Sequence, residues 1–137
     1  MTLSEDELKR RVLKECKTIA IVGLSDDPQR TSHRIGKYLK ETGYRIIPVN
    51  PEIAETLGKK AYPDLASIPF EVDVVDVFRR QEKVDSVIND ALQINPKAIW
   101  LQMGLTCPGD KTRLQDTDTD LIEDSCMMVE HRRLMSY

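Results

Sequence analysis

One short segment combines the residue types that bind phosphate groups. Residues 23–30 read GLSDDPQR and follow an apolar run, with a helix expected directly after them. Gly23 allows a ligand to approach the backbone closely, and Ser25 supplies a hydroxyl donor. The helix would direct free N–H groups and its positive dipole end at an anion, and Arg30 and Arg34 would add charge-assisted hydrogen bonds. The segment favours a phosphorylated ligand, although a plain strand-to-helix turn with solvated arginines has the same pattern.

The same segment disfavours NAD as that ligand. The dinucleotide fingerprint needs three glycines spaced G-x-G-x-x-G, and only the first is present here, at Gly23. The next strand ends in Val49-Asn50-Pro51, which offers no carboxylate to the ribose 2′-hydroxyl. The P-loop signature of many ATP sites is also absent from the sequence. Adenine nucleotides without a nicotinamide half therefore stay open as ligands.

Two acidic patterns invite a metal or acid–base interpretation, and neither is convincing. Asp116-x-Asp118-x-Asp120 matches the opening of a calcium loop, but Leu121 occupies the glycine position and Met127 the position of the closing glutamate. A solvated acidic loop is the better interpretation. Asp73 and Asp76 are three residues apart on one expected strand, so their side chains point to opposite faces. A buried Asp76 would need a polar partner.

Cys126, Glu130 and His131 form another candidate cluster near the C-terminus. A nucleophile needs a base that a third group orients, and one sequence cannot supply that geometry. The flanking Arg132 and Arg133 instead favour a structural ion pair with Glu130. We therefore expect neither catalytic residues nor a metal-binding set in this chain.

Apolar, partly β-branched runs predict the strands that position these residues. Strands are expected at residues 18–24, 44–49, 73–78 and 98–101, with a very short one at 61–62. Pro48 suits the end of a strand or an exposed sheet edge, because proline cannot donate to the ladder. Beyond residue 104 the pattern weakens, and a final strand is expected around residues 126–129.

Helical periodicity marks the segments between the strands. Ser4 and Glu7 form a capping box at the start of the first helix, and Gly43 stands where the second helix needs a left-handed C-cap. Helices are expected over residues 4–16, from 31 or 32 to 43, over 64–67 as a single turn, and over 84–92.

The alternation of strands and helices predicts the fold class α/β. We expect a Rossmann-like three-layer αβα domain with a mainly parallel five- or six-stranded sheet. It would span residues 1–137 as one domain, with an N-terminal helix at 1–16 and a core at 17–137. In such sheets ligands bind beyond the carboxyl ends of the strands, where the strand order reverses.

Composition restricts the partners of this domain. The 137 residues include 20 Lys and Arg against 23 Asp and Glu, a net charge of −3, which argues against binding nucleic acid or anionic membranes. No apolar run approaches the roughly 20 residues of a membrane span. The acidic N-terminus differs from a signal peptide, and the three cysteines lack CxxC spacing, so a cytoplasmic location is expected. A homodimer, through an edge strand or the first helix, is left open.

An ordered set of motifs extends through most of the sequence. In chain order these are Gly23-x-Ser25-x-x-Pro28-x-Arg30-x-Ser32, Gly43-Tyr44, Pro48-Val49-Asn50-Pro51, Asp73-Val74-Val75-Asp76-Val77-Phe78-Arg79, Trp100-Leu101-Gln102-Met103-Gly104 and Glu130-His131. This set resembles the stand-alone CoA-binding domain family, which is similar to the CoA-binding domain of the succinyl-CoA synthetase α-subunit. The resemblance implies a Rossmann-like fold with coenzyme A as the ligand.

The resemblance also implies where each part of CoA lies. By it, Gly23, Ser25, Pro28 and Arg30 form the phosphate loop, and Ser32 is a further cofactor-binding residue. Asn50-Pro51 lies near the adenosine, Phe78-Arg79 forms a cleft wall, and Gln102-Met103-Gly104 lies toward the pantetheine arm. The stretch after Gly104 departs from the family's acidic, alanine-rich helix. There Cys107 is expected as an exposed thiol in the cleft, open to a mixed disulfide with CoA.

The function expected from these observations is that of a small CoA or acyl-CoA binding protein that is not catalytic on its own. The synthetase relatives carry a second, nucleotide-activating half for which 137 residues leave no space. Two alternatives stay open: a subunit or accessory of an acyl-CoA metabolising enzyme, and a nucleotide-binding sensor.

Overall fold

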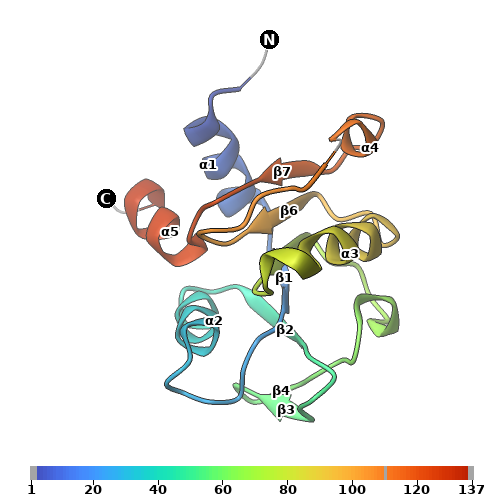
Figure 1. Cartoon of the computed structure of the whole chain (residues 1–137). Coiled ribbons are helices and arrows are strands. Elements are labelled where there is room, and N and C mark those ends of the chain that lie inside the picture. Colours follow the sequence, from blue (N-terminus) through green and yellow to red (C-terminus); the bar gives the residue numbers. More distant parts are fainter. Residues whose placement is uncertain (1–2, 110, 136–137) are drawn as a thin grey trace.

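The computed structural model describes residues 3–109 and 111–135, which form an α/β fold around a parallel sheet (Figure 1). In these residues the sheet has five strands in the order β2-β1-β5-β6-β7, and every neighbouring pair is parallel. The strands are β1 (Thr18–Val22), β2 (Arg45–Val49), β5 (Val74–Val77), β6 (Ala98–Leu101) and β7 (Asp120–Ile122). The expected fold class is confirmed.

Helices cover both faces of the sheet, which produces three layers (Figure 1). One face packs against α1 (Glu5–Glu15), α2 (Thr31–Glu41) and α5 (Met127–Met135). The other packs against α3 (Gln81–Leu92), the 3₁₀ turn η1 (Leu65–Ser67) and the short α4 (Thr112–Gln115). Strands buried on both faces are apolar at nearly every position, which explains their uniform sequence signal. None of these helices has both the length and the apolar character needed to cross a bilayer.

The strand order creates a switch point between β1 and β5. The chain leaves β1 toward β2 on one side and later returns to β5 on the other side. Loops at the carboxyl ends of β1 and β5 therefore diverge and leave a crevice between them. At the adjacent edge, a hairpin of β3 (Glu55–Thr56) and β4 (Lys59–Lys60) leads to an isolated bridge between Tyr62 and Val49, where a very short strand is expected. Pro48 lies in edge strand β2, as its chemistry predicts.

The predicted strand at residues 126–129 is wrong. The fifth strand is β7, at 120–122, where the backbone N–H of Asp120 donates to Lys97 and the Thr119 hydroxyl to Pro96. Residues 126–129 instead lead into α5, whose Met127 is fully buried. The signal for this helix was available, because Met127, His131 and Leu134 recur at helical spacing.

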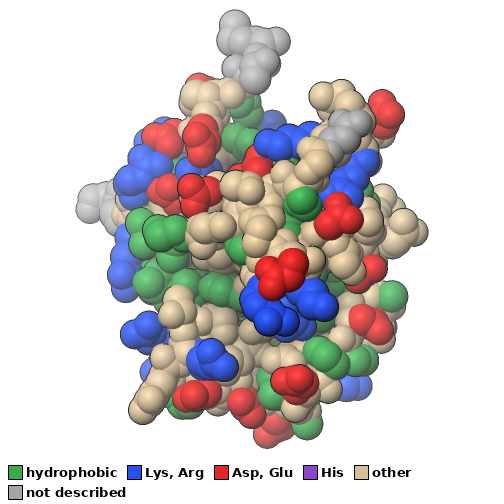
Figure 2. Space-filling view, in the orientation of Figure 1, with side chains coloured by type: hydrophobic (Ala, Val, Ile, Leu, Met, Phe, Trp, Pro, Cys, Tyr) green, Lys and Arg blue, Asp and Glu red, His purple; other side chains and the backbone are tan. Residues whose placement is uncertain are grey.

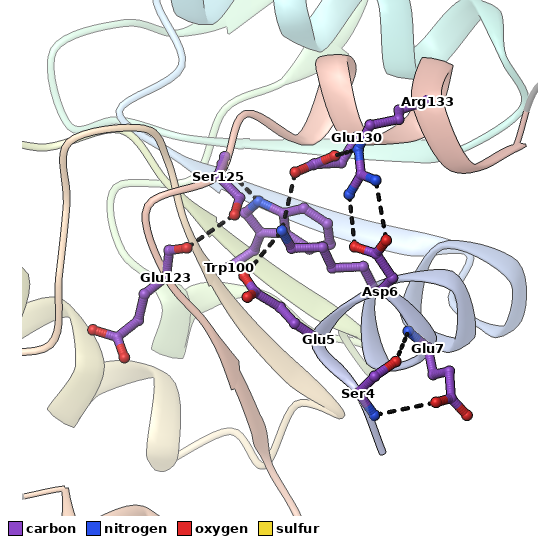
Figure 3. Close-up of polar contacts among 10 residues, drawn as sticks. Ser4, Glu5, Asp6, Glu7, Trp100, Glu123, Ser125, Glu130 and Arg133 are labelled. Carbon is purple, nitrogen blue, oxygen red and sulfur yellow. Dashed lines mark hydrogen bonds and ion pairs between the residues drawn. The ribbon is translucent and has the colours of Figure 1, made fainter.

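Ionic contacts join α1 to α5 (Figure 3). The expected capping box of Ser4 and Glu7 starts α1. Lys9 of α1 is 4 % exposed, and its ammonium lies 3.0 Å from a Glu130 carboxylate oxygen. Arg133 binds Asp6 at 2.7 Å and Glu130 at 2.6 Å. The predicted structural ion pair of Glu130 is thus present, with Arg133 and Lys9 as its partners.

Candidate functional site

A cleft of about 1330 Å³ lies at the switch point, across the carboxyl ends of β1, β2, β5 and β6. Its walls include the start of α2, one flank of α3 and the turn η1. Most residues expected at the site line this cleft: Gly23, Ser25, Arg30, Ser32, Asn50, Pro51, Phe78, Arg79, Gln102 and Met103. Pro28 and Gly104 do not line the cleft, although residues next to them in the sequence do.

The loop after β1 is held by side chains from three different elements. The backbone N–H of Ser25 donates to the Ser32 hydroxyl at 3.0 Å. The Asn50 amide donates to the carbonyl of Leu24 at 3.1 Å, and the Thr56 hydroxyl donates to the carbonyl of Ser25 at 3.3 Å. Since these bonds come from α2, from the residue after β2 and from the hairpin, the loop is preorganised for a ligand.

These bonds change the interpretation of two expected ligand contacts. Asn50 also accepts a hydrogen bond from the backbone of Glu52, so both ends of its amide are engaged within the protein. Ser32 is 8 % exposed and bonded to the loop. Both residues therefore support the loop. Thr56, 7 % exposed, shares this task and was missed, because only the tertiary fold brings the hairpin to the loop.

Gly23 fixes the distance between the ends of β1 and β5. Its φ of +89° is unfavourable for other residues, and a Cβ built there would lie 1.9 Å from the carbonyl oxygen of Phe78. The Gly23 N–H donates to Val49, and the Phe78 N–H donates to Val22. Position 23 thus requires glycine for the packing of β1 against the end of β5, whether or not a ligand approaches its backbone.

The cleft lining carries cationic side chains at two helix starts, together with the carboxylates of Asp26, Asp27, Glu52, Asp64 and Asp90. Figure 2 shows a cluster of Lys and Arg side chains over the beginning of α3, and Arg79, Arg80 and Lys83 line the cleft there. Arg30 is the N-cap of α2 and Arg80 that of α3, and neither helix has a side-chain cap. A cation at a helix start opposes the helix dipole, and a bound anion would relieve this repulsion.

The charges at the cleft are available to a ligand. Arg30, Arg79 and Lys83 form no ion pair with another residue of the described ranges. Arg34, also considered a phosphate ligand, lies outside the lining and its guanidinium donates to Thr31. Lys83 was missed by the sequence analysis, although its spacing from Arg79 and Arg80 places it in the first turn of α3.

Gln102 and Asp76 form a buried pair at the floor of the cleft. The Gln102 amide nitrogen donates to Asp76 Oδ1 at 2.5 Å, which provides the partner that a buried Asp76 was expected to need. Asp76 is 0 % exposed, and this burial raises its pKa to about 7, although the bond from Gln102 acts in the opposite direction. Asp73 instead accepts from the backbone of Lys17 and Thr18, so the two aspartates are separate, as predicted.

Cys107 is not the exposed thiol that was expected. It is 7 % exposed, does not line the cleft, and its sulfur lies 3.7 Å from an Arg113 guanidinium nitrogen. The fold turns this side chain into the core beside Leu114. The hypothesis of a mixed disulfide from Cys107 is therefore withdrawn.

The C-terminal cluster does not form an acid–base set. The His131 ring nitrogen Nδ1 and the Tyr38 hydroxyl are 2.7 Å apart, and burial lowers the pKa of His131. Glu130 is engaged by Lys9 and Arg133 instead. Glu130 thus joins α5 to α1, whereas the neighbouring His131 contacts Tyr38 of α2.

Comparison with known proteins places this cleft within a family. The pattern described as "CoA binding domain" matches residues 17–132, which include every expected site residue. The chain belongs to the CoA-binding domain family. This confirms the resemblance found in the sequence.

Relatives of this CoA-binding domain fall into two kinds. The Bacillus subtilis (strain 168) protein named "Uncharacterized protein YneT" is 41 % identical over 128 residues, which cover 93 % of this chain and 94 % of that protein. The "Acetate--CoA ligase [ADP-forming] II subunit alpha" of Pyrococcus furiosus is 42 % identical over 57 residues, 41 % of this chain. The match covers only 12 % of that subunit.

A solved structure confirms the fold of this CoA-binding domain. The "hypothetical protein from Pyrococcus horikoshii OT3" superposes with a TM-score of 0.91 at 34 % sequence identity. The superposition covers 98 % of this chain and 94 % of the other. The shared fold therefore covers nearly all of both chains.

Proposed function

We propose that this protein binds coenzyme A or an acyl-CoA in the cleft and does not transform it alone. The observation that carries the proposal is the position of Arg30, Arg79 and Lys83, none of which forms an ion pair with a described residue, at two helix starts without side-chain caps beside the switch point. Such a site suits a diphosphate, because backbone N–H groups, the helix dipole and arginines act on the same anion. Membership of the CoA-binding domain family supports CoA over other phosphorylated ligands.

The proposed ligand would extend along the edge of the sheet. Its diphosphate would lie at the start of α2 near Ser25 and Arg30, both of which line the cleft. The adenosine would lie toward Pro51, and the pantetheine arm toward Gln102 and Met103. The absence of NAD-specific features predicts that CoA binds much more tightly than NAD.

The test is calorimetric titration with CoA, with NAD and ADP as comparators. Arg30→Ala is expected to weaken CoA binding about ten- to hundredfold, since a charge-assisted hydrogen bond contributes about 1.5–3 kcal/mol. Arg34→Ala is the matched control: it removes the same charge one turn later on α2 but outside the cleft, and CoA affinity should stay within about twofold. Higher salt should weaken binding to the wild-type protein. Equal losses in both variants would contradict the assignment of Arg30.

A second candidate function is that of an accessory to an acyl-CoA metabolising enzyme. The match to the α-subunit of an acetate–CoA ligase favours it, although it covers a small part of that subunit. A turnover assay with acyl-CoA, with and without a separate ligase subunit, distinguishes the two. Turnover only in the mixture would favour the accessory function.

A further inference from the structure

Packing alone does not account for Asp76. It stands in β5 between Ile21 of β1 and Trp100 of β6, both of which are fully buried. Its Oδ1 accepts the bond from Gln102, whereas Oδ2 is buried without a partner among the described residues. An unpartnered carboxyl oxygen in a protein core costs stability that a valine at this position would not.

Gln102 connects this carboxyl to the cleft. It follows directly after β6, is 5 % exposed and lines the cleft. Its amide nitrogen points inward to Asp76. Its amide oxygen Oε1 makes no hydrogen bond to a described residue. This oxygen is not fully buried, so it is accessible from the cleft that Gln102 lines. The hydrogen bond to Asp76 thus holds the amide nitrogen of Gln102 inward.

We propose that Asp76 is a positioning residue that holds Gln102 with its carbonyl oxygen toward the cleft, where it accepts a hydrogen bond from an amide N–H of the ligand. The proposal rests on the proposed function, since it takes CoA as the ligand. The pantetheine arm of CoA contains two amide N–H donors. An amide without the bond to Asp76 can turn over and present its nitrogen instead, and a donor facing a donor makes no hydrogen bond.

The orientation does not depend on the charge of Asp76. The ionised carboxylate accepts from Gln102 with Oδ1, and the acid protonated on Oδ2 still accepts with Oδ1. No charged side chain contributes to the pKa of Asp76, and its register neighbours Ile21 and Trp100 do not titrate. Asp76 therefore acts through its acceptor atom, and the amide of asparagine retains such an atom.

The experiment measures the affinity for CoA, and for ADP as a ligand without the pantetheine arm, in a double-mutant cycle. Asp76→Val is expected to weaken CoA binding about three- to tenfold and to leave ADP binding within about twofold. Gln102→Leu should weaken CoA binding similarly. The double variant should bind CoA no more weakly than Gln102→Leu alone, because Asp76 acts only through Gln102.

Two further measurements separate positioning from a general structural role. Unfolding of Asp76→Val should show unchanged or increased stability, so a loss of affinity does not reflect loss of fold. Asp76→Asn keeps an acceptor oxygen for the Gln102 amide and should restore CoA affinity to within about twofold of wild type.

Three outcomes would overturn the inference: equal losses for CoA and ADP, additive losses in the double variant, or an asparagine variant as weak as valine. Failure of the wild-type protein to bind CoA would overturn the proposed function, and this inference with it. Normal CoA affinity in Asp76→Val would overturn the inference alone.

Discussion

Gly23→Ala is expected to destabilise the protein by more than about 3 kcal/mol and to disrupt the cleft. The new methyl group would lie 1.9 Å from the carbonyl oxygen of Phe78, which is backbone and cannot rotate away. The ends of β1 and β5 would have to separate, which breaks the hydrogen bond from the Phe78 N–H to Val22. A large loss of this kind follows from overpacking combined with a strained backbone. Denaturant unfolding measures the change in free energy.

Gly43→Ala is the matched control for this prediction. Gly43 also has a positive φ, of +108°, but a Cβ added there would meet no atom within 4 Å. Its replacement adds only the conformational cost, on the order of 1 kcal/mol. If the two alanine variants lose the same stability, contact with Phe78 is not the reason that position 23 requires glycine.

The second large effect is a fall in stability as the pH rises toward neutrality, caused by Asp76. Burial raises the pKa of Asp76 from 3.8 to about 7, so the folded protein keeps a proton there that the unfolded chain has released. The stabilisation of the folded state by this bound proton is fully present below pH 3.8. It is lost progressively as the pH rises from 3.8 to about 7. The loss is about 1.4 kcal/mol per pH unit within this window, or roughly 4 kcal/mol across it.

Asp76→Asn isolates this effect, because asparagine does not titrate. The free energy of unfolding of both proteins should be measured between pH 5 and pH 8.5, and the wild-type protein should lose stability relative to the variant as pH rises. The lowered pKa of His131 acts in the opposite direction, because the unfolded chain takes up a proton there more readily than the folded protein, and this effect cancels in the difference between the two proteins. Parallel curves would show that Asp76 is ionised throughout this range.

The sequence by itself determined the architecture and the general position of the site. Apolar strands buried on both faces have a continuous signal, and the capping box at Ser4 and the left-handed Gly43 after the C-cap Thr42 depend on neighbours along the chain. The sequence also indicated that the loop from Gly23 to Arg30 belongs to the candidate site, because its residues are contiguous, and most of them line the cleft. The C-terminal segment was misinterpreted as a strand at 126–129, since the weakly patterned strand at 120–122 is defined mainly by pairing with β6.

Only the tertiary structure decided what individual side chains do at the cleft. Asn50 and Ser32 were expected as ligand contacts, but contacts across the fold engage them with the loop, together with Thr56. Cys107 turned inward, and Asp76 acquired Gln102 as its partner. The physical reason is that the direction of a side chain and its hydrogen-bond partner depend on residues distant in sequence, whereas helix caps and strand patterns depend on residues nearby.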